Sequence, residues 1–290
     1  MTINMKPDDL KTKIFLDGGD PEETKLLIKE LGFLDGQTTN PTLVSKNPEA
    51  QKRLESGDKF TSEEIMDFYR DVVSKISQII PEGSVSIEVY ADESTTASEM
   101  MDQAKRMNEW IPNAHIKFPT THAGLAAAED AVKRGINVNM TLVFTQEQAA
   151  AVYAATRGAI KGQVFVSPFV GRLDDKGENG MDLIKNIIKM YESGDGHVEV
   201  LTASVRNLDH YEAALALGSD IITGPFKLTK DWKTNGMKVP EDYTYSPKDL
   251  KAIEYKDLDL NKDWQSFDIK HELTDAGIEK FAADWNALIK

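Results

Sequence analysis

Short apolar segments recur along this chain, and a stretch with helix-forming signals follows each of them. Several segments have valine and isoleucine at successive positions, so both faces are apolar, as in parallel strands that helices cover. Eight such strands alternating with helices predict an α/β fold, the (β/α)8 TIM-type barrel. We expect the strands at residues 13–18, 36–41, 85–90, 115–119, 137–144, 163–170, 198–205 and 221–228.

The intervening segments begin and end like helices. Asp20 can cap a helix that starts at Pro21 and stops at Gly32. The alternative arrangement is an open, doubly wound sheet, which usually carries a glycine-rich phosphate loop after its first strand. The sequence contains neither a GxGxxG motif nor a Walker loop, so we favour the barrel. Capping boxes are expected at Thr61 with Glu64, Thr96 with Glu99 and Thr145 with Gln148.

The chain after the eighth strand departs from this alternation. Residues from about 229 to 270 are polar and have no sustained period, which predicts an insertion or a loosely structured excursion. A C-terminal helix is expected at about 273–289. We therefore predict a single domain over residues 1–290, with the barrel at about 12–228. One face of the terminal helix carries Ile278, Phe281, Trp285 and Leu288.

Charge and composition argue against several classes of function. Lysine plus arginine number 34 against 48 aspartates and glutamates, and the net charge of −14 disfavours nucleic acid as a partner. The absence of cysteine excludes disulfides, thiolate catalysis and zinc–cysteine sites. No apolar run approaches the ~18 residues of a membrane span, and the N-terminus does not resemble a signal peptide. We expect a cytoplasmic enzyme with no membrane partner.

Lys117 lies inside the short apolar segment HIKFP, where a lysine is unusual. Lysine is almost never fully buried without a partner, because removing its ammonium group from water costs several kcal/mol. Either Lys117 reaches solvent at the end of its strand, or the protein uses a desolvated amine. Desolvation favours the neutral amine, which is the form that attacks a carbonyl group.

Polar side chains also occur in or just after nearly every other predicted strand. Each alone has a structural explanation, such as a turn or a surface ion pair. Their recurrence in seven strands is harder to attribute to packing, because active sites of this type of barrel lie at the C-terminal ends of the strands. The residues concerned are Asp17, Asn40, Glu88, Lys117, Asn139, Thr141, Ser167, Arg172, Ser204 and Arg206.

These residue types permit a fairly specific chemistry. The five histidines are scattered, and neither an HExxH motif nor a carboxylate cluster suggests a metal site. A desolvated lysine can condense with a ketone to form a Schiff base, which acts as an electron sink for cleavage of a carbon–carbon bond. A neighbouring carboxylate can remove the hydroxyl proton that starts this cleavage. Arginine side chains with a hydroxyl group are suited to holding a phosphate group.

The motifs that contain these residues resemble those of the transaldolase family. They are FLDGGD, DGQTTNPTLV, SIEVYAD, IKFPTT, GINVNMTLVFTQEQA, VSPFVGRLDD, LTASVRN, ITGPFKL and HELTDAGIEKFAADW, in family order over residues 13–228 and 271–285. The resemblance implies a barrel without cofactor or metal. It also implies transfer of a dihydroxyacetone unit from a ketose phosphate such as sedoheptulose 7-phosphate to glyceraldehyde 3-phosphate. The products are erythrose 4-phosphate and fructose 6-phosphate, in the non-oxidative pentose phosphate pathway.

The resemblance further implies a role for each candidate residue. Lys117 would form the Schiff base, and Asp17 would take and return the substrate's hydroxyl proton. Glu88 and Thr141, through a water, would handle protons while the carbinolamine forms and collapses. The positions that hold the hydroxyls of the dihydroxyacetone unit are Asn40, Asn139 and Ser167. The positions that hold phosphate are Arg172, Ser204 and Arg206. Family members form dimers or larger rings, so a homo-oligomer is expected.

One departure from the family pattern lies beside the predicted acid/base. Gly18 stands where the family usually has threonine, which leaves Asp17 with one hydroxyl neighbour fewer. The segment at 229–270 is also not part of the family core, and it could cover the barrel mouth, form a subunit contact or do nothing.

Three other functions make different predictions for these residues. The aldolase branch of the family releases free dihydroxyacetone from fructose 6-phosphate, and it typically has glutamine in place of Glu88 and tyrosine in place of Phe169. Glu88 with Phe169 therefore favours transfer over release. A sugar-phosphate binding protein that had lost catalysis would lack Lys117, Asp17 or Glu88. A purely structural barrel predicts no set of phosphate ligands.

Overall fold

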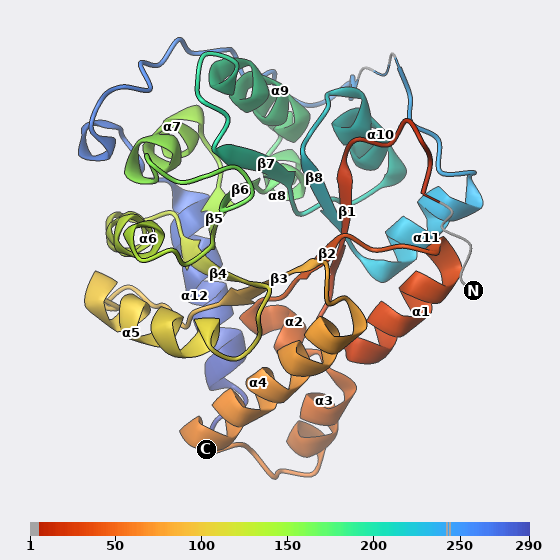
Figure 1. Ribbon diagram of the computed structural model, residues 1–290, viewed down its shortest axis with the longest axis vertical. Helices are drawn as coiled ribbons and strands as arrows, with labels where there is room; N and C mark the ends of the chain where they lie inside the picture. The colour runs from red at the N-terminus through yellow and green to blue at the C-terminus, as the bar shows by residue number, and fades with distance from the viewer. Residues whose placement is uncertain (1–5, 242, 244) are drawn as a thin grey trace.

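The chain closes into a barrel of eight parallel strands, which confirms the expected fold. The computed structural model describes residues 6–241, 243 and 245–290. The strands follow one another around the barrel in sequence order, and helices surround them on the outside (Figure 1). The strands are β1 (Lys13–Asp17), β2 (Gly36–Thr38), β3 (Ser84–Glu88), β4 (Ala114–Pro119), β5 (Val138–Val143), β6 (Val164–Pro168), β7 (Val198–Thr202) and β8 (Ile221–Gly224).

The helices between the strands begin at the predicted caps. Asp20 accepts a hydrogen bond from the Glu22 amide, and Gly32 ends the first helix with a φ of 82°. The three predicted capping boxes are present at the starts of the fourth, fifth and seventh helices. The helices are α1 (Pro21–Leu31), α2 (Pro41–Ser45), α3 (Pro48–Glu55), α4 (Ser62–Ile79), α5 (Ala97–Asn108), α6 (His122–Lys133), α7 (Gln146–Ala155), α8 (Val170–Asp174), α9 (Gly180–Tyr191), α10 (Leu208–Ala216), α11 (Phe226–Thr234), α12 (Glu272–Asn286) and the 3-10 helix η1 (Trp264–Ser266).

The structure has a helix after the eighth strand that the sequence analysis did not predict. The segment expected as a strand to residue 228 ends at Gly224, and α11 occupies Phe226–Thr234. Leu228 and Trp232 lie one helical turn apart and are both buried, with the Trp232 ring 5.2 Å from the ring of Tyr211. The change from strand to helix at Pro225 lies within one apolar run, which is why the pattern concealed it.

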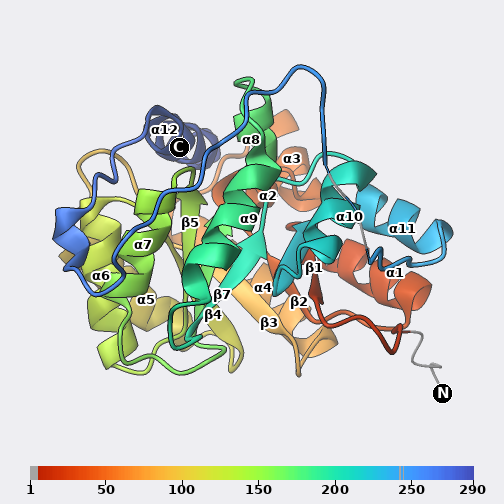
Figure 2. The ribbon, with the colours of Figure 1, turned by 90° about the horizontal axis from the view of Figure 1, so that it is seen from above.

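The segment expected as a loose excursion is held against the barrel. We call residues 245–263 the strap; it contains no helix, but it forms hydrogen bonds with the helices that it crosses. Lys251 exchanges backbone hydrogen bonds with Gly177 and Asn179, both at 2.8 Å. The Gln146 side chain bonds two backbone groups of the strap, each at 2.9 Å. Figure 2 shows the strap crossing α8 and α9 and descending beside α7. These polar contacts hold the strap in place although its sequence has no periodic pattern.

The N-terminal end of the barrel is closed by packed side chains. The Phe15 and Phe165 rings meet edge to face at 6.0 Å, and the His115 ring stacks on Phe165 at 4.0 Å. Burial lowers the pKa of His115 to about 4, so the stacked ring is neutral near pH 7. Lys13 Nζ lies 3.0 Å from an oxygen of Glu199 at the same end. This end therefore has a structural role.

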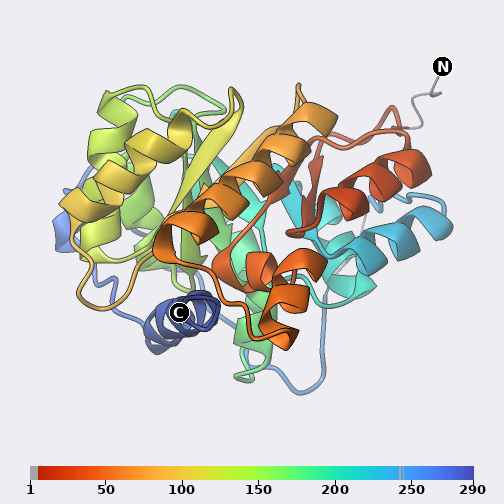
Figure 3. The ribbon, with the colours of Figure 1, turned by 90° about the horizontal axis from the view of Figure 1, so that it is seen from below.

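The C-terminal helix lies across the other end of the barrel (Figures 2 and 3). Its predicted apolar face is buried, and Thr274 Oγ1 donates a hydrogen bond of 2.9 Å to the Leu142 carbonyl at the end of β5. Leu142 has a left-handed backbone with a φ of 59°, at a register shift in β5. Helix α12 thus supports a strained part of the barrel mouth. Within the described ranges, every helix is too short or too polar to span a membrane.

Candidate active site

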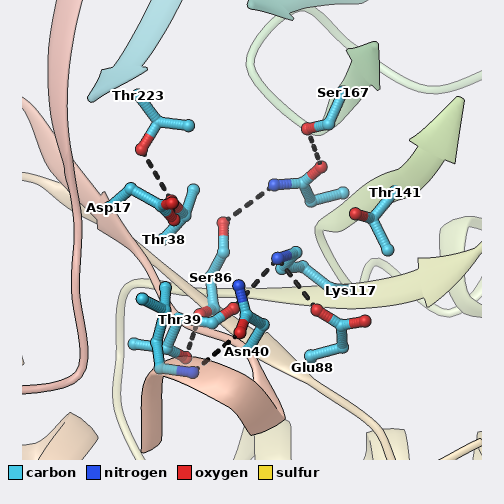
Figure 4. A network of polar contacts seen from close by, with 12 residues as sticks. Asp17, Thr38, Thr39, Asn40, Ser86, Glu88, Lys117, Thr141, Ser167 and Thr223 are labelled. Atoms are coloured by element: carbon cyan, nitrogen blue, oxygen red, sulfur yellow. Dashed lines mark hydrogen bonds and ion pairs between the residues drawn. The ribbon is translucent and has the colours of Figure 1, made fainter. Parts of the chain in front are cut away.

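Lys117 is buried near the C-terminal end of β4, with its amine beside a carboxylate. In the strand register, Glu88 on β3 and Asn139 on β5 are its direct neighbours. The Lys117 and Glu88 side chains are only 3% and 4% exposed, and Lys117 Nζ lies 2.9 Å from Glu88 Oε2. The amine also donates a hydrogen bond of 2.9 Å to the Thr39 carbonyl (Figure 4). Lys117 is therefore buried and does not reach solvent at the end of its strand.

Glu88 is placed to exchange protons with this amine. Burial raises the pKa of the Glu88 carboxyl, and the nearby Lys117 charge opposes that rise. The Glu88 amide donates a hydrogen bond of 2.9 Å to Tyr69 Oη, which fixes the end of β3. A carboxylate with a raised pKa is a better proton acceptor, so a proton can pass between the two side chains within the site.

Asp17 lies at the end of β1 and is supported by two threonines. Thr38 Oγ1 donates a hydrogen bond of 2.7 Å to Asp17 Oδ1, and Thr223 Oγ1 lies 2.6 Å from Thr38 Oγ1. Because Thr38 gives its proton to Asp17, Thr223 is the donor of the second bond. Burial raises the pKa of Asp17, while Lys117 and the Thr38 hydrogen bond oppose the rise. Asp17 is thus a candidate proton acceptor on another wall of the barrel from Glu88.

A second chain of hydrogen bonds crosses the barrel next to Lys117. Ser167 Oγ donates to Asn139 Oδ1 at 2.6 Å, and Asn139 Nδ2 donates to Ser86 Oγ at 3.0 Å. Thr141 Oγ1 is buried, and among the described residues it has no hydrogen-bond partner. A buried hydroxyl that lacks a protein partner is a suitable contact for a water or a substrate oxygen.

Two arginines lie at the mouth of the barrel, above these polar groups. Arg172 comes from α8, and Ser204 and Arg206 follow β7. Burial, together with the Arg206 charge, lowers the pKa of Arg172. Gly171 lets α8 approach the second segment closely, because a β-carbon there would lie 2.3 Å from the Ser204 carbonyl oxygen. Paired guanidinium groups with a hydroxyl group form a suitable site for a phosphate.

These groups surround one cavity of about 230 Å³ at the C-terminal end of the barrel. Glu88 and Asn139 lie just behind its wall, in contact with Lys117 and Ser167. The structure therefore brings together all of the residues that the sequence singled out. Those that line the cavity are Asp17, Asn40, Lys117, Thr141, Ser167, Phe169, Arg172, Ser204 and Arg206.

The site also contains polar groups that the sequence did not single out. Ser86 precedes Glu88 by two residues, so the alternation of a strand already places both on the same face. Thr38 and Thr223 support Asp17 from β2 and β8, but nothing in their local sequence indicates this contact. Lys46 and Lys280 also line the cavity, the latter from α12.

No metal site accompanies these groups in the part of the chain that the structure describes: no three histidine, aspartate or glutamate side chains there come together in a group that could hold an ion.

The comparison with protein families shows which family the chain belongs to. The model of the family described as Transaldolase/Fructose-6-phosphate aldolase matches residues 14–290. The chain belongs to this family.

Relatives within the family are similar over almost their whole length. A protein of Dehalococcoides mccartyi named "Probable transaldolase" is 35% identical, over 96% of this chain and 100% of that protein. Another of the same name, from Brucella ovis, is 36% identical over 94% of this chain and 96% of that protein. Among solved structures, 3-hexulose-6-phosphate synthase from Salmonella typhimurium is similar with a TM-score of 0.46 and 12% identity, over 74% of this chain and 88% of that one.

At Gly18, the space next to the α-carbon is taken up by the carboxyl group of Glu23. A β-carbon at Gly18 would lie 3.1 Å from Glu23 Oε2 on α1. Burial raises the pKa of Glu23, and the neighbouring Asp20 adds to the rise. The Glu23 carboxyl thus lies against the position where a threonine side chain would begin, while Asp17 keeps its hydrogen bond from Thr38.

Proposed function

We propose that this protein is a transaldolase. It transfers a dihydroxyacetone unit from a ketose phosphate, sedoheptulose 7-phosphate or fructose 6-phosphate, to an aldose phosphate, glyceraldehyde 3-phosphate or erythrose 4-phosphate. Membership of the family supports the reaction class. The observation that carries the proposal is the buried Lys117 amine, which lines a cavity and lies 2.9 Å from a carboxylate whose pKa burial raises.

The first step joins Lys117 to the donor. Glu88 accepts a proton from the Lys117 ammonium group, and the free amine attacks the ketone carbon to give a carbinolamine. The hydroxyl group of this intermediate then takes a proton and leaves as water, which produces the protonated Schiff base. Glu88 returns the proton that it took from Lys117 to this hydroxyl group, through a water that Thr141 Oγ1 holds, consistent with the unpartnered hydroxyl group of Thr141.

The second step breaks a carbon–carbon bond of the donor. This bond joins the carbon next to the imine carbon to the following carbon, which carries a hydroxyl group. Asp17 takes the proton of the hydroxyl on the far carbon, whose carbonyl forms as the bond breaks. The bonding electron pair moves onto the imine as an enamine, and the aldose phosphate departs. The enamine then attacks the acceptor's carbonyl carbon, and Asp17 returns its proton to the new hydroxyl. Hydrolysis of the Schiff base frees the product and Lys117.

The remaining groups hold the substrate in this geometry. Asn40 and Ser167 bind the hydroxyls of the three-carbon unit, and Asn139 acts on them through its hydrogen bond from Ser167 Oγ. The phosphate lies between the two arginines and Ser204. Phe169 supports transfer over release, because it places an apolar ring where the aldolase branch has a tyrosine hydroxyl. The ring is buried and packs against Phe144 with centroids 5.9 Å apart. An apolar wall at this point offers no hydrogen bond to an attacking water.

The wider setting of the reaction is part of the same proposal. We place it in the non-oxidative pentose phosphate pathway of the cytoplasm, in a homo-oligomer that uses sugar phosphates and neither nucleic acid nor a cofactor.

The deciding experiment measures glyceraldehyde 3-phosphate formed from fructose 6-phosphate, with and without erythrose 4-phosphate as acceptor. A transaldolase gives product only when the acceptor is present. Equal product without acceptor would establish an aldolase instead, and no product in either case would overturn the assigned substrates. Borohydride reduction in the presence of fructose 6-phosphate, followed by peptide mass analysis, tests the covalent intermediate. We expect the adduct on the peptide that contains Lys117.

A further inference from the structure

A hydrogen-bonded cluster joins the strap to both segments that carry the arginines of the cavity. Tyr245 Oη donates a hydrogen bond of 2.5 Å to Asp174 Oδ2, at the end of α8. His210 Nε2, on α10, lies 2.8 Å from the same oxygen and 3.0 Å from Tyr245 Oη. We propose that Tyr245 is a positioning residue: it fixes the segments that carry Arg172 and Arg206 relative to each other, so that both arginines face one phosphate. This inference rests on the proposed function, because it assigns the cavity arginines to a phosphate.

The hydrogen bonds of His210 determine its tautomer. The Arg206 amide donates to His210 Nδ1 at 3.3 Å, so Nδ1 is the acceptor and Nε2 carries the proton. Nε2 therefore donates to Asp174, and so does Tyr245. The Asp174 carboxylate thus connects, through the His210 ring, to the backbone of Arg206.

The same carboxylate fixes the segment that carries Arg172. Asp174 Oδ1 accepts a hydrogen bond of 2.9 Å from the Gly180 amide, where α9 begins. Arg172 lies two residues before Asp174 on the short helix α8, which has no side-chain cap. The position of Arg172 in the mouth therefore depends on how Asp174 anchors this helix.

Holding the two arginines together requires such support, because their charges repel each other. The Arg206 charge contributes to the lowered pKa of Arg172, which reports that repulsion. Arg206 also pairs with Asp175 at 3.0 Å, but this pair is exposed and is screened by solvent. The cluster around Asp174 is less exposed, and His210 is fully enclosed. Fixing both segments before substrate arrives reduces the ordering that phosphate binding must impose.

The strap supplies the third member of this cluster and is itself anchored on both sides of α9. Beyond Tyr245, its backbone pairs with Gly177 and Asn179, immediately after α8. Tyr245 does not line the cavity, so the cluster acts on the arginines from outside the site. We expect it to affect phosphate affinity and leave the chemical step unchanged.

The chain provides a matched control for this idea. Tyr243 Oη donates a hydrogen bond of 2.8 Å to Asp209 Oδ1, which also lies on α10, but it does not belong to the cluster. Tyr245→Phe and Tyr243→Phe each remove one tyrosine-to-aspartate hydrogen bond close together in the chain. A general loosening of this segment would follow from either change, whereas loss of arginine positioning would follow only from Tyr245→Phe.

The first measurement is calorimetric binding of inorganic phosphate to the full-length protein and both variants. We expect about 3- to 10-fold weaker binding in Tyr245→Phe, the effect of one lost hydrogen bond, and no change in Tyr243→Phe. Equal affinities in all three proteins, or equal weakening in both variants, would overturn the proposal. So would a wild-type protein that binds no phosphate.

The second measurement compares glyceraldehyde 3-phosphate with unphosphorylated glyceraldehyde as acceptor. Tyr245→Phe should raise KM for the phosphorylated acceptor by a similar factor, with kcat and the kinetics of glyceraldehyde unchanged. A fall in kcat with both acceptors would indicate a general structural role and contradict the inference. A wild-type protein that binds phosphate but transfers nothing would refute the proposed function, while the binding comparison would still decide the role of Tyr245.

Discussion

Two lysine–glutamate pairs of almost equal length lie at opposite ends of the barrel. At the N-terminal end, Lys13 Nζ is 3.0 Å from Glu199, and the lysine side chain is 42% exposed. At the C-terminal end, Lys117 Nζ is 2.9 Å from Glu88, and both side chains are almost completely buried. The distances do not distinguish the pairs, but their surroundings do.

In the N-terminal pair, the lysine is bonded to both carboxylate oxygens and is exposed to solvent. Lys13 contacts both oxygens of Glu199, at 3.0 and 3.2 Å, and its amine reaches solvent. Lys117 instead shares its amine between one carboxylate oxygen and a backbone carbonyl, beside a cavity. Both glutamates are buried, but only the C-terminal pair also buries its lysine, so that pair loses more solvation and costs more for folding. Burial next to a cavity therefore supports Lys117, and not Lys13, as the reactive lysine of the proposed mechanism.

The largest effect expected from this comparison is on activity when either lysine is removed. Lys117→Ala should lower turnover at least ~10⁴-fold, because it removes the nucleophile. Lys117→Arg should be equally inactive, since a guanidinium group stays protonated. Lys13→Ala should keep wild-type kcat and lose only stability, measured by thermal unfolding. Normal turnover in Lys117→Ala, or a comparable loss in Lys13→Ala, would show that the two ends have been assigned wrongly.

Much of this arrangement could be predicted from the sequence. The doubly apolar strands and the capping boxes indicate the barrel, because local backbone physics determines both. Lys117 stands out because a charge within an apolar strand is rare, and the other candidates stand out because they follow strand ends. The geometry of the barrel then brings all of these residues to its C-terminal end.

Other features could not be predicted, because they depend on contacts between distant segments. The support of Asp17 by Thr38 and Thr223 requires β1, β2 and β8 to meet in three dimensions. The strap is held by individual polar contacts, so its sequence has no period to detect. The left-handed backbone at Leu142 is also invisible, because leucine gives no sign of positive φ.

Asp17→Asn is expected to have the next largest effect on activity. The amide retains the shape of the side chain and can still accept from Thr38, but it cannot take a proton, so turnover should fall ~10²- to 10⁴-fold. Cleavage should slow more than Schiff-base formation, which borohydride trapping measures separately. Equal loss of both steps would contradict a separate role for Asp17.

The same substitution should raise stability at neutral pH. The native pKa of Asp17 is raised above the ordinary 3.8, chiefly by burial. The contribution of this group to stability is therefore present below 3.8 and is lost as pH rises through its native pKa. Asparagine avoids that loss, so Asp17→Asn should melt at a higher temperature than wild type at pH 7, with the difference shrinking towards pH 4. A lower melting temperature at pH 7 would mean that the lost attraction to Lys117 outweighs desolvation.

The smallest effects come from neutralising the acid of each pair in place. Glu88→Gln retains an oxygen beside Lys117 but accepts no proton, so we expect kcat to fall roughly 10- to 100-fold, with slower Schiff-base formation in single-turnover experiments. Glu199→Gln likewise retains an acceptor for Lys13, and it should change kcat less than about twofold and stability by about 1 kcal/mol. If both substitutions left kcat unchanged, proton exchange with Lys117 would have to run through another group. The two changes are chemically identical and both glutamate side chains are 4% exposed, so a difference between them in kcat reflects the contact of Glu88 with the lysine that lines the cavity.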